Sequence, residues 1–423
     1  MKILWITNQA TPEISAQLGK GMSVGGGWMN TLSHQVSAEH ELVIVFPCDV
    51  WTKDIDGTIS GINYYGIQMK KANDKASTSV LEKIKRIIKL QKPDIVHIWG
   101  TEYIHSWSAA CACEELGLLD NVVVSIQGLV SIYKFHFWCG LDRKDFPIVT
   151  LRDLKFKSGI TAKYESFIKR GFYEKLTLQK VNNVIGRTDW DEACVLQYNP
   201  CINYFFCNET LRESFYNNRW DISQCKKYTV FVSQSQYPIK GFHMALETIA
   251  ILKRKWPDVK LITTGRDRIH CTKKELLKFG DYDLLIRKKI ITLGLEKNVV
   301  FVGSLDERSM CKQYTSSHVF LSPSSIENSP NSVGEAMLLG MPVVTSDVGG
   351  VKNMLSHNLE GYIYQYDAPY MAAYYIDKIF SDDVLANSLG EKAYLHAKQT
   401  HDGVKNYNVM MSIYERISKG ANN

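Results

Sequence analysis

The sequence predicts an α/β protein with two domains, each built on a parallel β-sheet. The chain has 423 residues, whereas a single hydrophobic core stops growing at roughly 250–300 residues. Short β-branched runs alternate with helical patterns, which is typical of parallel sheets assembled from right-handed βαβ units. A stretch between about residues 199 and 227, rich in Asn, Tyr, Phe and Cys, interrupts this alternation. We interpret it as the connection between the domains.

The predicted elements form two series. In the first, strands over 2–7, 40–47, 93–99, 121–127 and 181–187 alternate with helices over 28–39, 81–90 and after Thr188. In the second, strands over 228–234, 259–265, 299–303, 319–322 and 342–346 alternate with helices over 241–256, 306–316 and 332–339. We therefore expect Rossmann-like domains over 1–205 and 206–395, facing each other across a cleft, and a helical tail over 396–423 that crosses back to the first domain. Open parallel sheets bind ligands beyond the carboxyl ends of their strands, so the cleft is the expected active site.

Composition excludes several classes of protein. Hydrophobic residues make up 45% and charged residues 22% of the chain, which argues against disordered and fibrous proteins. Apolar runs are too short to span a bilayer, and the first residues do not resemble a signal peptide, so we expect a cytoplasmic protein. Ten cysteines without a CxxC pair or zinc-like spacing predict reduced thiols and no metal site.

The positive charge is concentrated in one segment. The net charge is +6, too little to imply a nucleic-acid partner. Residues 134–180 contain eleven Lys and Arg against five Asp and Glu, and they are rich in aromatic residues. Such a segment suits the surface of an anionic membrane and peripheral attachment to its inner face. The alternative is a solvated helix face with a packed aromatic side.

The end of the predicted strand 319–322 is rich in polar residues. The helix that begins near Asn331 or Ser332 offers free backbone N–H groups and a positive dipole end, which favour a diphosphate. Glu327 precedes that helix and Glu335 lies in its first turn, so one carboxylate can approach the phosphate while the other meets a pair of hydroxyls. Ordinary helix capping is the alternative interpretation.

Two other strand ends carry candidate residues. Lys240 stands just before Gly241 at the start of a helix, where an ammonium group can stabilise a diphosphate leaving group. It can equally be a solvated lysine in a turn. After the first strand, three glycines at 25–27 and then Trp28 allow close approach of the backbone to a ligand, or form a merely flexible loop.

Together these features resemble the retaining glycosyltransferases of the GT-B fold, known as group 1 or family 4. Glu327-x7-Glu335, Lys240-Gly241 and the stretch 342–350 (PVVTSDVGG) occur in the order and spacing of that family, and residues 93–97 (PDIVH) match its first domain. The resemblance implies an acceptor domain over 1–205 and a nucleotide-sugar domain over 206–395. It implies transfer of a sugar from a UDP- or GDP-sugar to a saccharide or lipid-linked saccharide, with retention and without a metal or other cofactor. The expected setting is bacterial surface-polysaccharide biosynthesis.

The resemblance also implies roles for individual residues. Lys240 and Glu327 would be catalytic, on the diphosphate and beside the transferred sugar, and Glu335 would hold the ribose hydroxyls. The remaining donor-binding residues would be the backbone of Asn328, Asn331, Ser332 and Val333, together with Gly26, Gly27, Gly265 and Arg266. The acceptor would meet Trp28, Trp99, Thr101, Glu102 and Gln127. His97, inside a predicted strand, is either a buried structural histidine or a residue near the acceptor.

Two departures from the family pattern leave alternatives open. Gln234 and Ser235 fill places where the family has Gly-Arg, so Arg266 or Arg187 would have to supply the missing cation. Gln127 stands where many relatives have a histidine, and glutamine cannot act as a base. The rivals to the transferase are therefore a non-catalytic nucleotide-sugar or glycan-binding scaffold and a sugar-nucleotide epimerase of the same fold.

Overall fold

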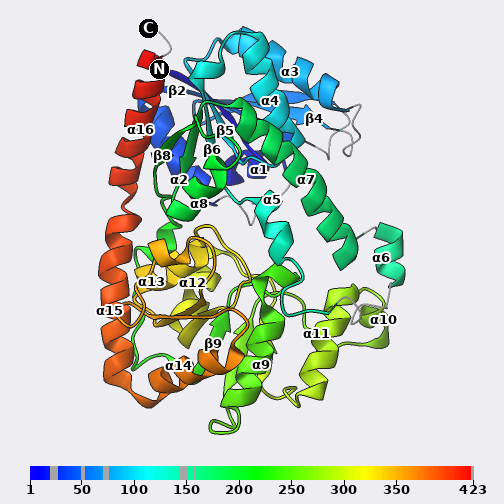
Figure 1. The fold of residues 1–423 in the computed structure, drawn as a ribbon, viewed down its shortest axis with the longest axis vertical. Helices are drawn as coiled ribbons and strands as arrows, with labels where there is room; N and C mark the ends of the chain where they lie inside the picture. Colours follow the sequence, from blue (N-terminus) through cyan, green and yellow to red (C-terminus); the bar gives the residue numbers. More distant parts are fainter. Residues whose placement is uncertain (20–26, 49–52, 70–75, 143–149, 157, 421–423) are drawn as a thin grey trace. The chain divides into compact units, whose positions relative to one another are not determined.

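The computed structural model describes residues 1–19, 27–48, 53–69, 76–142, 150–156 and 158–420. Within them the chain forms two compact units, each with its own sheet (Figure 1). Unit 1 comprises Met1–Ile132, Ile168–Thr210 and Asp402–Asn423, and unit 2 comprises Tyr133–Phe167 and Leu211–His401. The structure thus divides the chain after Thr210 and His401, where the sequence predicted divisions after residues 205 and 395.

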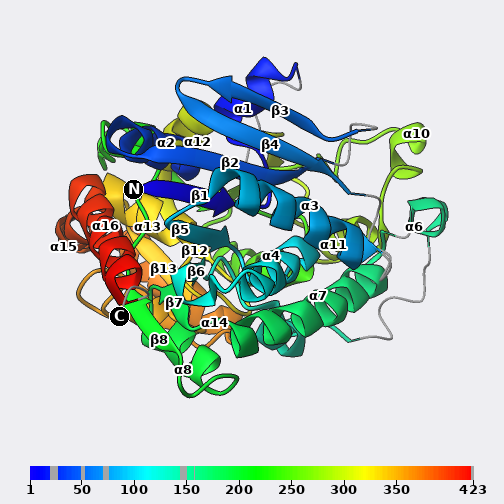
Figure 2. The ribbon, with the colours of Figure 1, turned by 90° about the horizontal axis from the view of Figure 1, so that it is seen from above.

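The sheet of unit 1 has the strand order β3-β4-β2-β1-β5-β6-β7-β8 (Figure 2). Its strands are β1 (Lys2–Ile6), β2 (Glu41–Cys48), β3 (Ile55–Ile59), β4 (Ile62–Gln68), β5 (Ile95–Trp99), β6 (Val122–Ser125), β7 (Asn183–Gly186) and β8 (Asn203–Phe206). Neighbouring strands are parallel except β3 and β4, which form an antiparallel pair at the edge. The predicted strands of this half are present, but β3, β4 and β8 were not predicted.

Helices cover both faces of this sheet, which explains its nearly continuous hydrophobic strands. Along β1, Leu4 and Ile6 face a core shared with α3 (Ala76–Gln91) and α4 (Ile104–Glu115). Ile3 and Trp5 face the opposite core, shared with α2 (Gly27–Glu39) and α16 (Gly403–Gly420). The carboxy-terminal helix α16 is therefore part of the first unit.

His97 ties β5 to α16. Its Nδ1 is hydrogen-bonded to the Tyr414 hydroxyl, and its Nε2 lies 2.7 Å from Ser125 Oγ. The side chain is fully buried, and burial lowers the pKa of His97 to about 3. The structural interpretation of this histidine is confirmed, because a neutral ring with both nitrogens engaged inside a core is not placed to meet a substrate.

The sheet of unit 2 is parallel throughout, in the order β11-β10-β9-β12-β13-β14. Its strands are β9 (Lys226–Val232), β10 (Lys260–Thr263), β11 (Val299–Phe301), β12 (Ser317–Ser322), β13 (Val343–Ser346) and β14 (Tyr362–Tyr364). The chain moves outward from β9 to β11 and then returns to the other side of β9 with β12. The strand order therefore reverses between β9 and β12, and this switch point is where open parallel sheets bind ligands.

The other helices connect the strands or flank the sheets. They are α1 (Pro12–Gln17), α5 (Val130–Tyr133), α6 (Leu151–Phe156), α7 (Ile160–Lys180), α8 (Asp189–Leu196), α9 (Phe242–Leu252), α10 (Lys273–Leu276), α11 (Asp281–Thr292), α12 (Glu307–Thr315), α13 (Asn331–Leu339), α14 (Pro369–Ser381) and α15 (Asp383–Thr400). In the part of the chain that the structure describes, none of the helices is long and apolar enough to cross a membrane.

Residues 133–167 were assigned to the first domain by the sequence prediction, and this was wrong. Hydrogen bonds show why the segment groups with unit 2. The Ser325 hydroxyl donates to the His136 carbonyl over 2.9 Å, and the Asp281 N–H donates to the Asp153 carboxylate over 2.9 Å. These contacts join residues far apart in sequence, so no local pattern reveals them.

Candidate active site

The switch point of unit 2 brings Lys240 and Glu327 together. Lys240 follows β9 and Glu327 follows β12, the two strands on either side of the reversal. Lys240 Nζ lies 2.6 Å from Glu327 Oε1, which also accepts a hydrogen bond of 2.7 Å from the Ser324 hydroxyl. The two residues identified as catalytic from the sequence are therefore direct neighbours.

Two glycines make this arrangement possible. Gly241 has φ +66°, and a Cβ on it would lie 1.7 Å from the Pro323 carbonyl oxygen. Gly349 has φ +49°, and a Cβ there would lie 1.8 Å from the Glu327 carbonyl oxygen. Both positions require glycine for backbone conformation and for space. The Lys240-Gly241 pair and the end of the PVVTSDVGG stretch thus hold the two loops of the site against each other.

Lys240 is a fixed cation in this site. Burial works to lower the pKa of Lys240, but the adjacent Glu327 carboxylate outweighs burial and raises it. The ammonium group therefore remains charged at all physiological pH values. A charged donor at a strand end is suited to an anionic ligand such as a diphosphate.

Glu335 is held by a residue that the sequence did not point to. Arg212 Nε and Nη2 donate to the two oxygens of the Glu335 carboxylate over 2.6 and 2.8 Å. Glu335 is 5% exposed, and burial raises its pKa while Arg212 opposes that rise. A carboxylate offers about four lone-pair sites, so the bidentate pair leaves acceptor capacity for hydroxyl groups. Glu335 is the fifth residue of α13, so the prediction that it lies in the first turn was wrong.

Two of the predicted backbone contacts at the start of α13 are already engaged within unit 2. The Asn328 N–H donates to the Tyr133 hydroxyl over 2.9 Å, and the Val333 N–H donates to the Pro330 carbonyl over 2.9 Å. These N–H groups are not available to a donor in this structure, which contradicts that expectation for Asn328 and Val333. Asn331 and Ser332 are the first two residues of the helix, the region whose amides have no acceptor inside a helix.

The guanidinium beside Ser235 comes from Arg268, and neither predicted substitute takes that place. Arg268 donates to Ser235 Oγ and to the Ser235 carbonyl, each over 3.1 Å, and to Asp283 over 2.8 Å. At 2% exposure it is a buried structural residue. Arg266 instead donates to the Lys278 carbonyl over 2.7 Å, away from Ser235.

Gly265 follows the end of β10 and lies next to Ser235 and Gln236, which follow β9. It has φ +103°, and a Cβ on it would lie 3.4 Å from both Ser235 Oγ and Gln236 Nε2. Its N–H donates to the Gly303 carbonyl over 2.8 Å. Gly265 therefore borders the Ser235 loop, and its contact with the donor stays a prediction.

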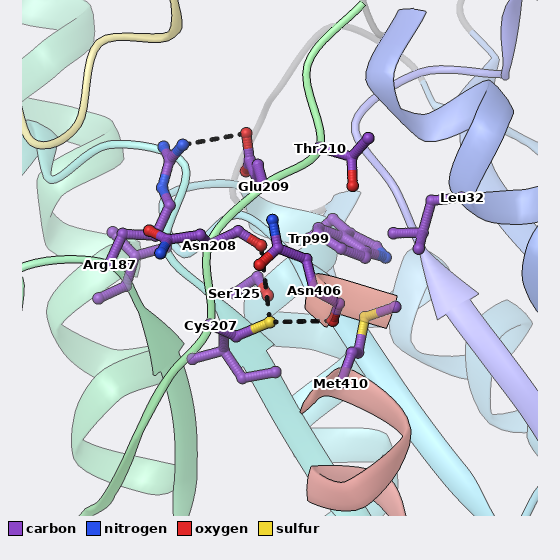
Figure 3. Close-up of a pocket in the computed structure, with 12 residues that line it drawn as sticks. Leu32, Trp99, Ser125, Arg187, Cys207, Asn208, Glu209, Thr210, Asn406 and Met410 are labelled. Carbon is purple, nitrogen blue, oxygen red and sulfur yellow. Dashed lines mark hydrogen bonds and ion pairs between the residues drawn. The ribbon is translucent and has the colours of Figure 1, made fainter. Parts of the chain in front are cut away.

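In unit 1, a pocket lies at the carboxyl ends of β5 to β8 (Figure 3). Trp99, Arg187, Glu209, Asn406 and Met410 are among its lining residues. Its free volume is about 30 Å³, room for no more than a few water molecules. A sugar ring does not fit it without movement of side chains.

Gln127 and Arg187 are joined through Glu209. Gln127 Nε2 donates to Glu209 Oε1 over 2.8 Å, and Arg187 lies 3.1 Å from Glu209 Oε2. Arg187 is therefore paired inside unit 1, where it was a candidate for the missing cation of the donor site. Of the predicted acceptor residues, Trp99 lines this pocket, and Gln127 is hydrogen-bonded to Glu209, which also lines it.

Other predicted acceptor residues are buried. Thr101 is 0% exposed and donates to Glu174 over 3.1 Å. Glu102 is 6% exposed and lies 3.5 Å from the Arg170 guanidinium. Both side chains are thus engaged inside unit 1, and their contact with an acceptor stays a prediction. Gly27 is the first residue of α2, whereas Gly26 and the Trp28 side chain lie outside the described residues.

Within the described ranges, no group of three or more His, Cys, Asp or Glu side chains is arranged to hold a metal ion. All ten cysteines are free thiols. The residues that sequence reasoning missed are Arg212, Tyr133 and Arg268 in unit 2 and Glu209 beside the pocket of unit 1. Each is isolated in the sequence and belongs to no recognisable motif.

Parts of this chain are similar in sequence to known glycosyltransferases. Residues 214–396 match the family model described as glycosyl transferases group 1. Spore coat protein SA of Bacillus subtilis is 26% identical over 196 residues, which cover 45% of this chain and 49% of that protein. The amylovoran biosynthesis glycosyltransferase AmsK of Erwinia amylovora is 27% identical over 130 residues, 29% of each chain. The chain thus spans about half or less of the length of these curated relatives.

Solved structures match nearly the whole chain. Sucrose-phosphate synthase of Thermosynechococcus elongatus superposes with a TM-score of 0.72 at 15% identity, over 99% of this chain and 100% of that chain. Anabaena HepE, solved in complex with UDP, has a TM-score of 0.64 at 15% identity, over 98% and 100%. At this identity the likeness concerns the fold. The predicted GT-B architecture of two parallel-sheet α/β domains is confirmed.

Proposed function

We propose that the protein is a group 1 glycosyl transferase, the family whose model matches residues 214–396, and that it transfers a sugar from a nucleoside-diphosphate sugar to a saccharide or lipid-linked saccharide. The observation that carries the proposal is the Lys240–Glu327 pair at the switch point of unit 2, with Glu335 on the helix that follows. Neighbouring structures solved with UDP and UDP-glucose support a nucleotide sugar as the partner. The AmsK relative supports a role in polysaccharide biosynthesis.

The proposed reaction retains the anomeric configuration. The bond between the anomeric carbon and the diphosphate oxygen breaks, the acceptor oxygen forms a new bond on the same face, and the leaving diphosphate takes the acceptor proton. Lys240 would stabilise the charge that develops on the diphosphate, and Glu335 would accept hydrogen bonds from the ribose hydroxyls. This division needs no base at Gln127 and no metal. Full activity in the presence of EDTA would support the metal-free part of the proposal, and loss of activity that Mg²⁺ restores would contradict it.

Two variants test the residue assignments. Glu335→Ala is expected to weaken nucleoside-diphosphate binding, because the ribose loses its acceptor. Lys240→Ala is expected to lower kcat much more than donor affinity, because its charge matters most when the diphosphate leaves. Glu391→Ala and Lys255→Ala, at more exposed positions, are the matched controls. Normal nucleotide binding by Glu335→Ala in calorimetry would remove the ribose assignment.

The products distinguish the transferase from its rivals. With UDP- and GDP-sugars alone, a transferase is expected to release nucleoside diphosphate slowly by hydrolysis, and faster once an acceptor saccharide is added. A non-catalytic scaffold would bind the donor and release nothing. An epimerase would convert the donor into a new nucleotide sugar without any acceptor.

We also propose that residues 134–180 attach the protein to an anionic membrane. Exposed aromatic side chains lie beside lysines in this segment, with Lys134 Nζ 4.9 Å from the Phe135 ring centre and Lys155 Nζ 5.5 Å from that of Phe156. On α7, Phe172 is 60% exposed. Exposed rings next to basic groups favour insertion at a negatively charged interface.

Liposome flotation tests the membrane proposal. The wild type is expected to float with vesicles that contain phosphatidylglycerol and not with pure phosphatidylcholine. Phe135→Ser and Phe172→Ser are expected to reduce flotation, whereas Val384→Ser, which is exposed on α15, is not. Flotation that does not depend on anionic lipid, or that the Phe variants leave unchanged, would refute the proposal.

A further inference from the structure

The side-chain amide of Asn328 carries a buried donor that the protein itself does not use. Asn328 follows Glu327 directly, and its side chain is 4% exposed. Among the described residues, its Nδ2 is buried and has no hydrogen-bond partner. A buried N–H group without an acceptor is unfavourable, so such a group in a native protein points to a missing partner.

The Tyr133 hydroxyl determines which way this amide faces. It accepts the Asn328 N–H over 2.9 Å and lies 3.1 Å from Asn328 Oδ1. The hydroxyl accepts from the backbone N–H and donates its own proton to the side-chain oxygen. The atom facing Tyr133 is therefore the amide oxygen, and the NH2 group points away from the ring with both protons available.

The surroundings of the NH2 group indicate the chemistry of its partner. In the sequence Asn328 lies between Glu327, which is paired with Lys240, and the first turn of α13. The ammonium of Lys240 supplies the charge that a phosphate needs. A neutral, directional donor beside it is suited to a neutral oxygen such as a hydroxyl.

We infer that the Asn328 amide binds a hydroxyl oxygen of the sugar being transferred, and that Tyr133 is the residue that positions it. This inference rests on the proposed function, because it names a contact inside the same donor site. Tyr133 belongs to the segment 133–167 that packs with unit 2. The segment would then contribute to sugar selection as well as to the fold.

The test compares two pairs of ligands on three variants. Calorimetry is done with UDP and UDP-glucose, and again with GDP and GDP-mannose, on the full chain. Tyr133→Phe frees the amide to rotate, and Asn328→Ala removes it. For the nucleotide sugar that the wild type binds, each is expected to raise Kd about 3- to 10-fold, the range for one lost neutral hydrogen bond. The Kd of the corresponding nucleoside diphosphate is expected to stay unchanged.

The third variant separates a positioning role from a merely structural one. Because Tyr133 acts through Asn328, Tyr133→Phe combined with Asn328→Ala is expected to bind the nucleotide sugar no more weakly than Asn328→Ala alone. Tyr370→Phe, at an exposed position on α14, is the matched control and is expected to bind both ligands as the wild type does. Additive losses in the double variant would overturn the positioning role of Tyr133.

The possible failures are distinguishable. If the wild type binds none of the four ligands, the proposed function fails. If the wild type binds a nucleotide sugar and the Asn328 and Tyr133 variants bind it equally well, the inference fails while the proposed function stands. If the variants lose affinity equally for nucleotide sugar and nucleoside diphosphate, the amide contacts the diphosphate and the assignment to a sugar hydroxyl is overturned.

Discussion

Replacing Arg212 by Gln leaves the Glu335 carboxylate buried without its cation. In the wild type the guanidinium donates to both carboxylate oxygens, over 2.6 and 2.8 Å. The Glu335 side chain is 7% exposed and the Arg212 side chain 23%, so both groups are largely removed from water. Because glutamine is neutral, the variant has an uncompensated negative charge inside unit 2.

The expected cost is substantial. Removing one partner of a buried ion pair costs about 3–5 kcal/mol, and the partial exposure of Arg212 favours the lower end. For a unit of roughly 230 residues, about 3 kcal/mol corresponds to a fall in Tm of roughly 6–12 °C. Arg219→Gln is the matched control, because its partner Glu391 and Arg219 itself are both exposed, and such pairs contribute about 1 kcal/mol or less.

The loss of stability should depend on pH. Burial raises the pKa of Glu335 above the ordinary carboxyl range, so the folded state holds this proton more tightly than the unfolded state does. The contribution of Glu335 therefore lowers the free energy of unfolding as pH rises through and above that range. This loss of stability becomes smaller as pH falls. Without Arg212, which opposes the rise in pKa, the penalty at pH 7 is larger. The difference in Tm between wild type and Arg212→Gln is therefore expected to narrow from pH 7 to pH 5.

Thermal unfolding followed by circular dichroism at pH 7 and pH 5 measures both effects. Adding Glu335→Gln to Arg212→Gln removes the buried charge and is expected to recover much of the lost stability. A fall in Tm below about 2 °C at pH 7, or an equal fall at both pH values, would show that the pair does not hold a buried charge and would refute the reasoning.

Three further predictions concern positions away from this pair. Gly349→Ala is expected to destabilise unit 2 and lower turnover, because a Cβ would lie 1.8 Å from the Glu327 carbonyl oxygen. Gly294→Ala is the control, since a Cβ there meets nothing closer than 4.0 Å. Equal losses of Tm and activity in the two variants would contradict this prediction. Tyr414→Phe is expected to cost unit 1 about 1–3 kcal/mol in urea unfolding, because Trp5 and His97 lose their hydroxyl partner; an unchanged midpoint would contradict it. Burial lowers the pKa of His97 to about 3, so unit 1 is expected to lose stability as pH falls from about 6.5 towards 3, and to lose less of it in His97→Phe.

Local signals account for what the sequence predicted of the fold. The strands buried on both faces, such as β1 and β5, are short runs of apolar residues that stand out from their surroundings. The edge strand β3 alternates between intermediate and exposed positions, which resembles a loop as much as a strand. β8 lies in the polar stretch that was interpreted as a connection. Strands are therefore easiest to recognise where the sheet is most deeply buried.

The candidate site likewise contains residues that the sequence could predict and residues that it could not. Lys240, Glu327 and Glu335 follow strand ends in fixed spacing, so a sequence motif locates them. Their partners do not follow any spacing, because Arg212 is 123 residues from Glu335 and Tyr133 is 195 residues from Asn328. Contacts of this kind arise only from the tertiary packing, and they decide which donors and acceptors remain for a ligand.

A crystal structure of the protein with a bound nucleoside diphosphate would test the central claim most directly. We predict that the diphosphate lies within hydrogen-bonding distance of Lys240 Nζ at the start of α13. The ribose hydroxyls are expected to donate to Glu335 while Arg212 still holds that carboxylate from the other side. A nucleotide bound elsewhere, or bound at this strand edge with its ribose away from Glu335, would contradict the account.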